Sequence, residues 1–300
     1  MGHRVGSLNL GGPLSGDEGK QSKAGQWYRK AAAFAMNDLG ALLGRGGREA
    51  EAEQWYRKAA AAGDAVAMYN LGAMLDGQEG RQAEAERWYR QAAGAGHVFA
   101  MHNLGILLRG QEGRQAEAEQ WYRQAAGAGH VFAMYSLGLL LSGQEGRQAE
   151  AERWYRKAIE AGDVEAMTFL GLLLAGQDGR QAEAERWYRK AIDAGDGDAM
   201  TFLGILLSDQ DGRQAEAELW YRKAIDAGYA VAMYNLGLLL VDQEDRQAEA
   251  EHWLRQAAGA GDADAMNDLG DLLTERGQQA EAEQWYRKAA GAGAGGSHEI

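Results

Sequence analysis

Six histidines and a recurring Glu-Ala-Glu motif are the side chains of this 300-residue sequence that could support metal or acid–base chemistry. The histidines are His3, His97, His102, His130, His252 and His298. His97 and His102 are five residues apart, off the four-residue spacing that puts two metal ligands on one helix face. The Glu-Ala-Glu pairs recur along the chain, and no HExxH, P-loop or GxSxG motif accompanies them. The sequence therefore predicts no enzyme, no cofactor, and no catalytic, cofactor-binding or metal-binding residues.

Runs that mix aromatic and basic residues, such as Trp154, Tyr155, Arg156 and Lys157, have two interpretations. They can form a platform on which nucleic-acid bases stack, or a buried helix face flanked by solvated charges. On a helix, the two aromatic residues fall on the apolar stripe and the two basic residues on the far side. The chain carries 44 acidic and 31 basic residues, a formal charge of −13 that repels phosphate backbones. We interpret the runs as architecture and expect no nucleic-acid partner.

A repeat of 33 residues governs the rest of the sequence. Tryptophan occurs at positions 27, 55, 88, 121, 154, 187, 220, 253 and 285, and six consecutive spacings are 33 residues. Each unit contains two segments with helical spacing of apolar residues. We name them helix A, which carries a Met such as Met167, and helix B, which carries the Trp, as in residues 148–161. A fixed period with two helices per unit predicts an all-α solenoid of antiparallel helix pairs.

Capping and glycine signals support this assignment. An Asp precedes helix A in several units and is expected to cap its free amides; these residues are Asp64, Asp163, Asp196 and Asp262. Gly162 follows helix B at the position that favours a left-handed backbone, and Glu152 and Arg156 are spaced for an ion pair. One glycine recurs within helix A and predicts a close approach of another helix. Its positions are Gly40, Gly72, Gly105, Gly138, Gly171, Gly204, Gly237 and Gly270.

The pattern A-M-x-x-L-G, followed by E-A-E-x-W-Y-R-K-A and A-G-D-x-x-A, resembles Sel1-like repeats, which are related to the tetratricopeptide repeat. The resemblance covers roughly residues 8–293. It implies about nine repeats stacked as a right-handed superhelical solenoid, with a concave face that binds partner proteins. We expect a degenerate N-terminal repeat at residues 1–34, the repeat solenoid at 35–293 and a C-terminal tail at 294–300.

Partner binding is expected at the positions of helix A that vary between repeats, because scaffold positions repeat. The candidates are Val66, Tyr69, Asn70, Phe99, His102, Asn103, Phe132, Tyr135, Tyr234 and Asn235. In related peptide-binding repeats, an Asn at the position of Asn70, Asn103 and Asn235 hydrogen-bonds the bound backbone. The alternative is that these Asn residues only solvate a helix face. For Phe99 and Phe132, the alternative to a binding surface is packing between repeats.

The function expected from the repeats is that of a scaffold or adaptor that binds a protein or peptide on this face. Its first half is expected to bind an apolar or aromatic segment. Its second half is expected to prefer a basic segment because it is acidic at Glu165, Asp198, Asp264 and Asp271. The alternative is a self-associating structural protein whose partner is another copy of the chain.

The location expected for the protein is the cytoplasm, or a secreted or periplasmic location if an upstream leader is missing. No stretch approaches the ~20 apolar residues of a membrane span, so no membrane partner is expected. The chain contains no Cys, which excludes disulfides, thiolate catalysis and Cys-based zinc sites.

The first junction between helix B and helix A is shorter than the others. Trp27 and Met36 are 9 residues apart, whereas Trp and Met are 13 apart at every later junction. The loss of four residues preserves helical phase, so the apolar residues on both sides fall on one stripe. We predict one continuous helix over residues 22–43; the alternative is a tight turn near Ala33. Because Pro13 disrupts the preceding helix A, the stripe would be covered by a partner or by a homo-oligomer through the N-terminal unit.

Overall fold

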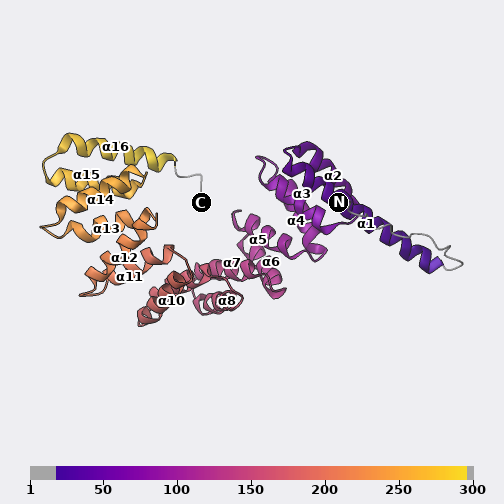
Figure 1. Ribbon diagram of the computed structural model, residues 1–300, viewed down its shortest axis with the longest axis horizontal. Helices are drawn as coiled ribbons and strands as arrows, with labels where there is room; N and C mark the ends of the chain where they lie inside the picture. Colours follow the sequence, from indigo (N-terminus) through magenta and orange to yellow (C-terminus); the bar gives the residue numbers. More distant parts are fainter. Residues whose placement is uncertain (1–17, 296–300) are drawn as a thin grey trace, which may run out of the picture. The chain divides into compact units, whose positions relative to one another are not determined.

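A computed structural model describes residues 18–295 of the chain, and this part contains sixteen helices and no strand (Figure 1). The predicted all-α fold is therefore confirmed. In chain order the helices are α1 (Glu18–Arg45), α2 (Glu49–Ala61), α3 (Ala65–Asp76), α4 (Gln82–Gly94), α5 (Val98–Arg109), α6 (Gln115–Gly127), α7 (Val131–Ser142), α8 (Gln148–Glu160), α9 (Glu165–Ala175), α10 (Gln181–Asp193), α11 (Asp198–Ser208), α12 (Gln214–Asp226), α13 (Val231–Val241), α14 (Gln247–Gly259), α15 (Ala263–Glu275) and α16 (Gln279–Gly295). Pro13 and most of the expected tail at 294–300 lie outside the described residues.

The helices group into two compact units, which divide after Ala133. Unit 1 contains α1 to α6 and the first residues of α7, and unit 2 contains the remainder. From α2 onward, even-numbered helices are helix B and odd-numbered helices are helix A. Within each unit, a helix B packs against the helix A before it and the helix A after it, as α4 does with α3 and α5. Across residues 18–295, no helix combines the length and the apolar character needed to cross a membrane.

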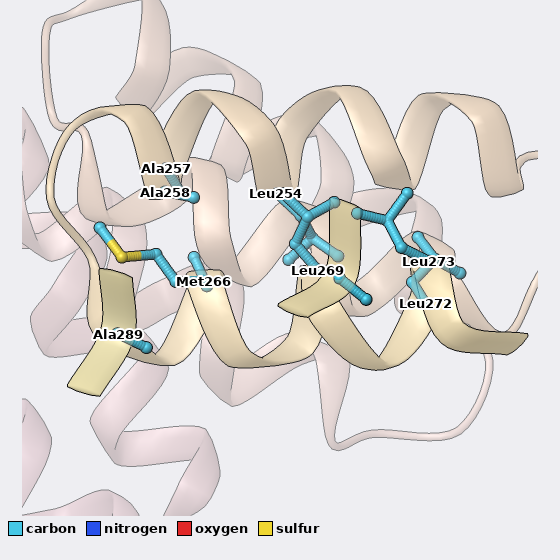
Figure 2. Close-up of a cluster of buried hydrophobic side chains, with 10 residues drawn as sticks. Leu254, Ala257, Ala258, Met266, Leu269, Leu272, Leu273 and Ala289 are labelled. Atoms are coloured by element: carbon cyan, nitrogen blue, oxygen red, sulfur yellow. The ribbon is translucent and has the colours of Figure 1, made fainter. Parts of the chain in front are cut away.

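The core of each unit is a layer of small and aliphatic side chains between neighbouring helices, with one Tyr from helix B. Figure 2 shows it at the end of unit 2, where Leu254 and Ala258 of α14 lie in one buried cluster with Leu269 of α15. Tyr155 of α8 is buried as predicted. Trp154 differs: it is only half-buried, because its indole lies at the outer surface with the Lys157 ammonium 4.2 Å from the ring centroid.

The glycine that recurs in helix A lets the helix B tyrosine pack directly against the helix A backbone. A Cβ on Gly171 would lie 2.6 Å from the ring of Tyr188, and one on Gly138 would lie 2.7 Å from the ring of Tyr155. The predicted close approach of the helices is therefore confirmed. Gly162, after α8, also has the predicted left-handed backbone, with φ of +96°.

Three of the four Asp residues that precede helix A cap it as predicted. The side chains of Asp64, Asp163 and Asp262 each accept a hydrogen bond of 2.9 Å from the amide three residues later, as predicted. Asp196 differs, because one oxygen accepts from the amide only two residues later. Its other oxygen accepts a hydrogen bond of 2.6 Å from the hydroxyl of Thr168, so this carboxylate joins two neighbouring repeats.

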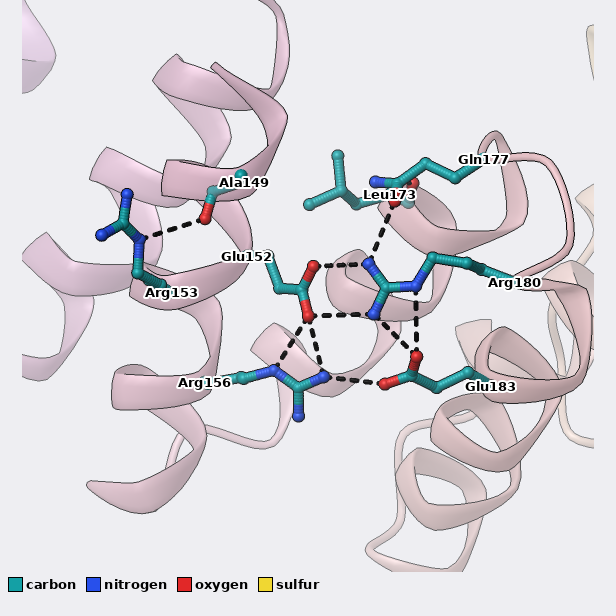
Figure 3. Close-up of polar contacts among 8 residues, drawn as sticks. All are labelled: Ala149, Glu152, Arg153, Arg156, Leu173, Gln177, Arg180 and Glu183. Atoms are coloured by element: carbon teal, nitrogen blue, oxygen red, sulfur yellow. Dashed lines mark hydrogen bonds and ion pairs between the residues drawn. The ribbon is translucent and has the colours of Figure 1, made fainter. Parts of the chain in front are cut away.

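Within each unit, consecutive B helices are joined by a group of four charged side chains, which we call a charge square (Figure 3). Between α8 and α10, Arg180 donates to Glu152 at 2.6 Å and to Glu183 at 2.7 Å. Arg156 donates to the same two carboxylates at 2.8 and 2.7 Å, which confirms the predicted pair with Glu152. Equivalent squares occur in both units, as at Glu53 and at Glu185. The Glu-Ala-Glu and basic motifs therefore hold repeats together, as the architectural interpretation requires.

Helix α1 is one continuous helix of 28 residues, about 42 Å long at 1.5 Å per residue. The predicted helix over residues 22–43 is thus confirmed, and the chain does not reverse near Ala33. The expected boundary between residues 34 and 35 falls inside this helix. The N-terminal half of α1 projects beyond α2 (Figure 1), and Trp27 and Tyr28 on it are exposed.

Candidate functional site

The candidate residues two positions before the helix A methionine form a row of exposed apolar side chains in unit 1. Val66, Phe99 and Phe132 occupy the first turns of α3, α5 and α7. The Phe99 side chain is 55% exposed and the Phe132 side chain 61% exposed. Both rings are therefore outside the core, although each also contacts a neighbouring residue.

Beneath this row, aromatic and imidazole rings form a continuous ladder across three repeats. Tyr69 stacks on His97 with ring centroids 4.7 Å apart. The rings of Phe99 and His130 are perpendicular, with centroids 4.7 Å apart, and the His130 ring lies 5.9 Å from that of Phe132. Each phenylalanine ring therefore has a ring contact within the protein and is still more than half exposed. The two interpretations of these rings, packing between repeats and a binding surface, are thus compatible in the structure.

His102 lies at the centre of the same ladder, half-buried, with its ring 4.8 Å from that of His130 and 5.8 Å from that of Tyr122. Burial, followed by the nearby His130, lowers the pKa of His102 to about 4. Burial also lowers the pKa values of His97 and His130. These imidazoles are therefore held in the neutral form, in which a ring nitrogen can accept a hydrogen bond.

His97 and His130 use that acceptor to cap helices. The Nδ1 atom of His97 accepts from the amide of Ala100 at 3.2 Å, and Nδ1 of His130 accepts from the amide of Ala133 at 3.1 Å. They replace the Asp that caps helix A in other repeats. Protonation of Nδ1 would remove the acceptor and place a positive charge at a helix N-terminus, where the helix dipole opposes it.

Unit 1 is therefore expected to lose stability as the pH falls from about 6.5 toward about 4. A histidine whose folded pKa lies below its ordinary value of 6.5 stabilises the fold fully above 6.5. That contribution is lost as pH falls through the folded pKa. The measurement is thermal unfolding between pH 7.5 and 4.5. The variant His130→Asp restores the usual cap and should show a weaker dependence in this range; an unchanged dependence would contradict the assignment.

The candidate asparagines use their amides within the protein. Asn70 donates to Asn37 of α1 at 2.9 Å, and Asn103 donates to the Tyr89 hydroxyl at 3.4 Å. Asn235 donates to a carbonyl in its own helix at 3.1 Å. The structure does not place these three amides in one ladder, and their binding of a peptide backbone stays a prediction.

In unit 2 the remaining candidate residues are tied to acidic side chains. The Tyr135 hydroxyl donates to Glu165 at 3.1 Å, and the Tyr234 hydroxyl donates to Asp268 at 2.8 Å. Burial, with these carboxylates adding to it, raises the pKa of both tyrosines. The acidic residues predicted for this face are exposed; they are Glu165, Asp198, Asp264 and Asp271. No group of side chains suited to a metal ion occurs within the described part of the chain.

A further row of apolar side chains, which the sequence pattern did not predict as a site, lies five positions after the helix A methionine. Ile106, Leu172 and Leu238 are large aliphatic residues that stay exposed on helix A. In unit 2 a cavity of about 330 Å³ opens between α7 and α9, with Leu139 and Leu172 in its lining. The position is aliphatic in five consecutive repeats and is Ala73 in α3 and Asp271 in α15, so it resembles a scaffold position over most of the chain. The sequence feature that could have predicted this row is an aliphatic residue at a helix position next to the core stripe.

Six segments of the chain match the family model described as Sel1 repeat: residues 3–33, 65–97, 98–130, 131–163, 197–229 and 230–262. Together they make up more than half of the chain. Residues 35–62, 149–199 and 263–290 match models of the tetratricopeptide repeat. A search of the curated proteins finds no match.

Solved structures with repeat folds are similar over most of the chain. A protective antigen of uropathogenic Escherichia coli strains, which displays an SLR fold, has a TM-score of 0.62 at 27% identity; the match covers 90% of this chain and 64% of the antigen chain. A Sel1 repeat protein from Oxalobacter formigenes has a TM-score of 0.59 at 28% identity, covering 74% and 96%. Yeast Tom70, at 14% identity with a TM-score of 0.59 and coverage of 82% and 56%, shares the fold alone. The chain thus spans less than two thirds of the antigen.

Proposed function

Because this chain belongs to the Sel1 repeat family, we propose that it is a scaffold that binds a partner protein or peptide on the helix A faces of its repeats. Repeats of this kind generally mediate protein–protein interaction and are generally not catalytic. The charge squares are formed at the B helices, and the candidate residues lie on helix A. Its side chains differ between repeats, as specific recognition needs.

The observation that supports this proposal best is the row of exposed phenylalanines in unit 1. Phe99 and Phe132 are more than half exposed, although the removal of an apolar ring from water is favourable. The ladder beneath holds each ring in place, so binding costs little side-chain entropy. Such fixed aromatic groups are the usual anchors of protein interfaces. The partner segment for unit 1 therefore carries apolar or aromatic side chains.

The helix A faces of unit 2 favour a partner segment of different chemistry. Leu172 of α9 and Leu238 of α13 are exposed. The A helices of the same unit also carry exposed acidic side chains, which are Glu165 of α9, Asp198 of α11 and Asp264 of α15. A segment that combines aliphatic side chains with Lys or Arg would match both features, because opposite charges steer encounter and exclude acidic competitors. We propose this chemistry for the partner of unit 2.

Replacing both Phe99 and Phe132 by Ala is expected to weaken partner binding by at least about tenfold. The probe is a set of peptides selected from a random phage-displayed library against the wild-type protein, with affinities measured by fluorescence anisotropy. Helix content should not change, because both rings lie outside the core.

The matched control is Leu219→Ala, which removes an exposed apolar side chain from α12, a helix B. This variant should bind the selected peptides like the wild type. Equal affinity of the double phenylalanine variant and the wild type would refute the proposed anchor.

Self-association is the second candidate function, and one observation favours it. Trp27 on the projecting half of α1 is 75% exposed, and an exposed large aromatic on an apolar stripe marks an interaction surface. Oligomers that form with rising concentration and ignore a bound peptide would support this function. Oligomers that the peptide disrupts would instead place the contact on the helix A faces.

A further inference from the structure

The first end of the repeat stack exposes a helix A face that is covered in every later repeat. The C-terminal half of α1 occupies the helix A position, and Leu39 on it is 36% exposed. The equivalent leucines of the seven later repeats are all 0% exposed; they are Leu71, Leu104, Leu137, Leu170, Leu203, Leu236 and Leu269. Ala35 is likewise exposed, whereas its equivalents are buried. The cause is the fused helix: no preceding helix B folds back onto this face.

The last end of the stack exposes the complementary helix B face. Ala290 of α16 is exposed, whereas its equivalents in α2, α4, α6 and α14 are buried. Ala258 of α14 lies in one buried cluster with residues of the following helix A, and the described chain has no helix after α16. Each end of the stack therefore lacks the type of helix that the other end presents.

The junction of α14 and α15 shows how these two faces fit together (Figure 2). Ala258 of α14 lies in one buried cluster with Ala265 and Leu269 of α15. Ala290 is the equivalent of Ala258 by its distance from the helix B tryptophan, and Leu39 is the equivalent of Leu269. The exposed faces of α16 and α1 thus carry the two halves of a contact that the chain already makes internally.

We infer that two copies of this chain associate head to tail, with α16 of one copy packed on residues 35–43 of α1 in the next. The inference specifies the self-association named as the second candidate function. It does not depend on partner binding by the helix A faces. The proposed contact continues the repeat from one chain into another.

A cavity beside α1 supports the packing of α16 of a second copy at this place. It measures about 460 Å³ and is lined by Trp27 and Phe34 of α1 and by the turn between α2 and α3, residues 62–66. In unit 2, two consecutive turns of this kind pack on each other, because Tyr229 lies against Gly197. The first junction lacks four residues that form such a turn.

The C-terminal end of α16 carries the sequence that the first junction lacks. Residues 289–293 read AAGAG, as do residues 257–261, which end α14 and begin its turn. Helix α16 is also four residues longer than the 13-residue helix B of the preceding repeats. In the proposed contact, this end of α16 lies at the cavity beside the projecting half of α1.

The charges at the two ends are complementary as well. At the first end, Arg48 and Glu51 pair with each other, and at the last end Arg287 pairs with Glu283. Both pairs are much more exposed than the interior squares. In a complete square, as in Figure 3, residues at the positions of Arg48 and Glu51 bind residues at the positions of Glu283 and Arg287. Head-to-tail packing would therefore complete one more square.

Pairing of two α1 helices fits these observations less well. The projecting half of α1 exposes Lys23, Arg29 and Lys30, and two such segments would repel each other. A head-to-tail contact is heterologous, so it leaves one free face of each type in a dimer and allows further addition. The contact therefore predicts oligomers larger than dimers as concentration rises.

The test uses the absence of Cys from the chain. Leu39→Cys and Ala290→Cys are prepared as separate variants and treated with a short bismaleimide cross-linker, alone and as a mixture. Cross-linked dimers are expected only in the mixture, and the double variant should give a ladder of larger products. Leu172→Cys mixed with Ala290→Cys is the control and should give no product. Circular dichroism verifies that each variant, changed at an exposed position, keeps its fold.

Sedimentation velocity of the wild type gives an independent readout. We expect the wild type to form larger oligomers as its concentration rises. Leu39→Asp should raise the concentration needed for oligomers at least about tenfold. Products from Leu39→Cys alone would overturn the inference, because they indicate a symmetric contact. If the wild type forms oligomers but the mixture of the two Cys variants gives no cross-linked dimer, this interface is wrong and self-association occurs elsewhere. A wild type that stays monomeric would refute both and leave peptide binding by the helix A faces unaffected.

Discussion

Gly204→Ala is expected to destabilise unit 2 by about 1–3 kcal/mol, the usual cost of overpacking a filled core. The new Cβ would lie 2.4 Å from Cε1 and 2.6 Å from Cδ1 of Tyr221. That ring is buried, so it cannot move away without displacing its own neighbours. Alanine is the better helix former by about 1 kcal/mol. The clash outweighs that gain because two ring atoms are closer than van der Waals contact allows.

The matched control for this prediction is Gly259→Ala in the same unit. Gly259 ends α14, and no atom lies within 4 Å of the position that its Cβ would take. This variant should be as stable as the wild type or slightly more stable, because only helix propensity changes. Urea unfolding followed by circular dichroism measures both. If the two variants shift the midpoint equally, the packing role assigned to the recurring glycine is wrong.

The repeat pattern was sufficient to predict the features that depend on one segment of chain. The fused helix α1 followed from a deletion that preserved helical phase, and the glycine contact followed from a costly residue recurring at one position. The pair between Glu152 and Arg156 followed from a spacing of four. The fused helix and the ion pair involve residues that are close in sequence, so local geometry determines them. The glycine contact joins two helices, and it was predictable because the costly residue recurs at a fixed position.

Features that depend on how repeats stack could not be obtained in this way. Arg180 binds Glu152 from 28 residues away, and only the alignment of consecutive B helices brings them together. The exposure of Leu172 was missed for a different reason. The position is aliphatic in most repeats, as a buried position would be, but on helix A it lies just outside the strip that neighbouring helices cover. Repetition therefore does not separate buried scaffold positions from a surface that every repeat presents.

The charge squares are expected to make the protein lose stability in acid between about pH 4.5 and pH 2. Hydrogen bonds from Arg180 are the main reason that the pKa of Glu152 falls from 4.5 to about 2. The same value holds for the equivalent Glu53, Glu86 and Glu185. A carboxylate with a lowered folded pKa stabilises the fold fully above pH 4.5, and that contribution is lost as pH falls toward 2.

The contribution of each charge square to the free energy of unfolding depends on the partial exposure of its side chains. Solvent screening reduces each contribution to about 1 kcal/mol, but several squares act on a fold whose total stability is of order 5–15 kcal/mol. Their loss should therefore lower the urea midpoint substantially between pH 5 and pH 2.5. This window lies mostly below that of the histidine ladder, so the two effects separate in a pH series. Salt should weaken the squares, since screening reduces attraction between partly exposed charges.

Glu152→Gln tests the assignment, because it replaces the carboxylate by a neutral side chain of similar size. The variant should be less stable than the wild type by about 1 kcal/mol at pH 7. The difference should shrink toward zero near pH 2, where the wild-type Glu152 also becomes neutral. Glu160→Gln is the control, because Glu160 is an exposed residue at the C-terminal end of the same helix. Its stability should equal that of the wild type at every pH. A pH-independent gap between Glu152→Gln and the wild type would mean that the side chain contributes by packing, and the charge square would then not account for the acid sensitivity.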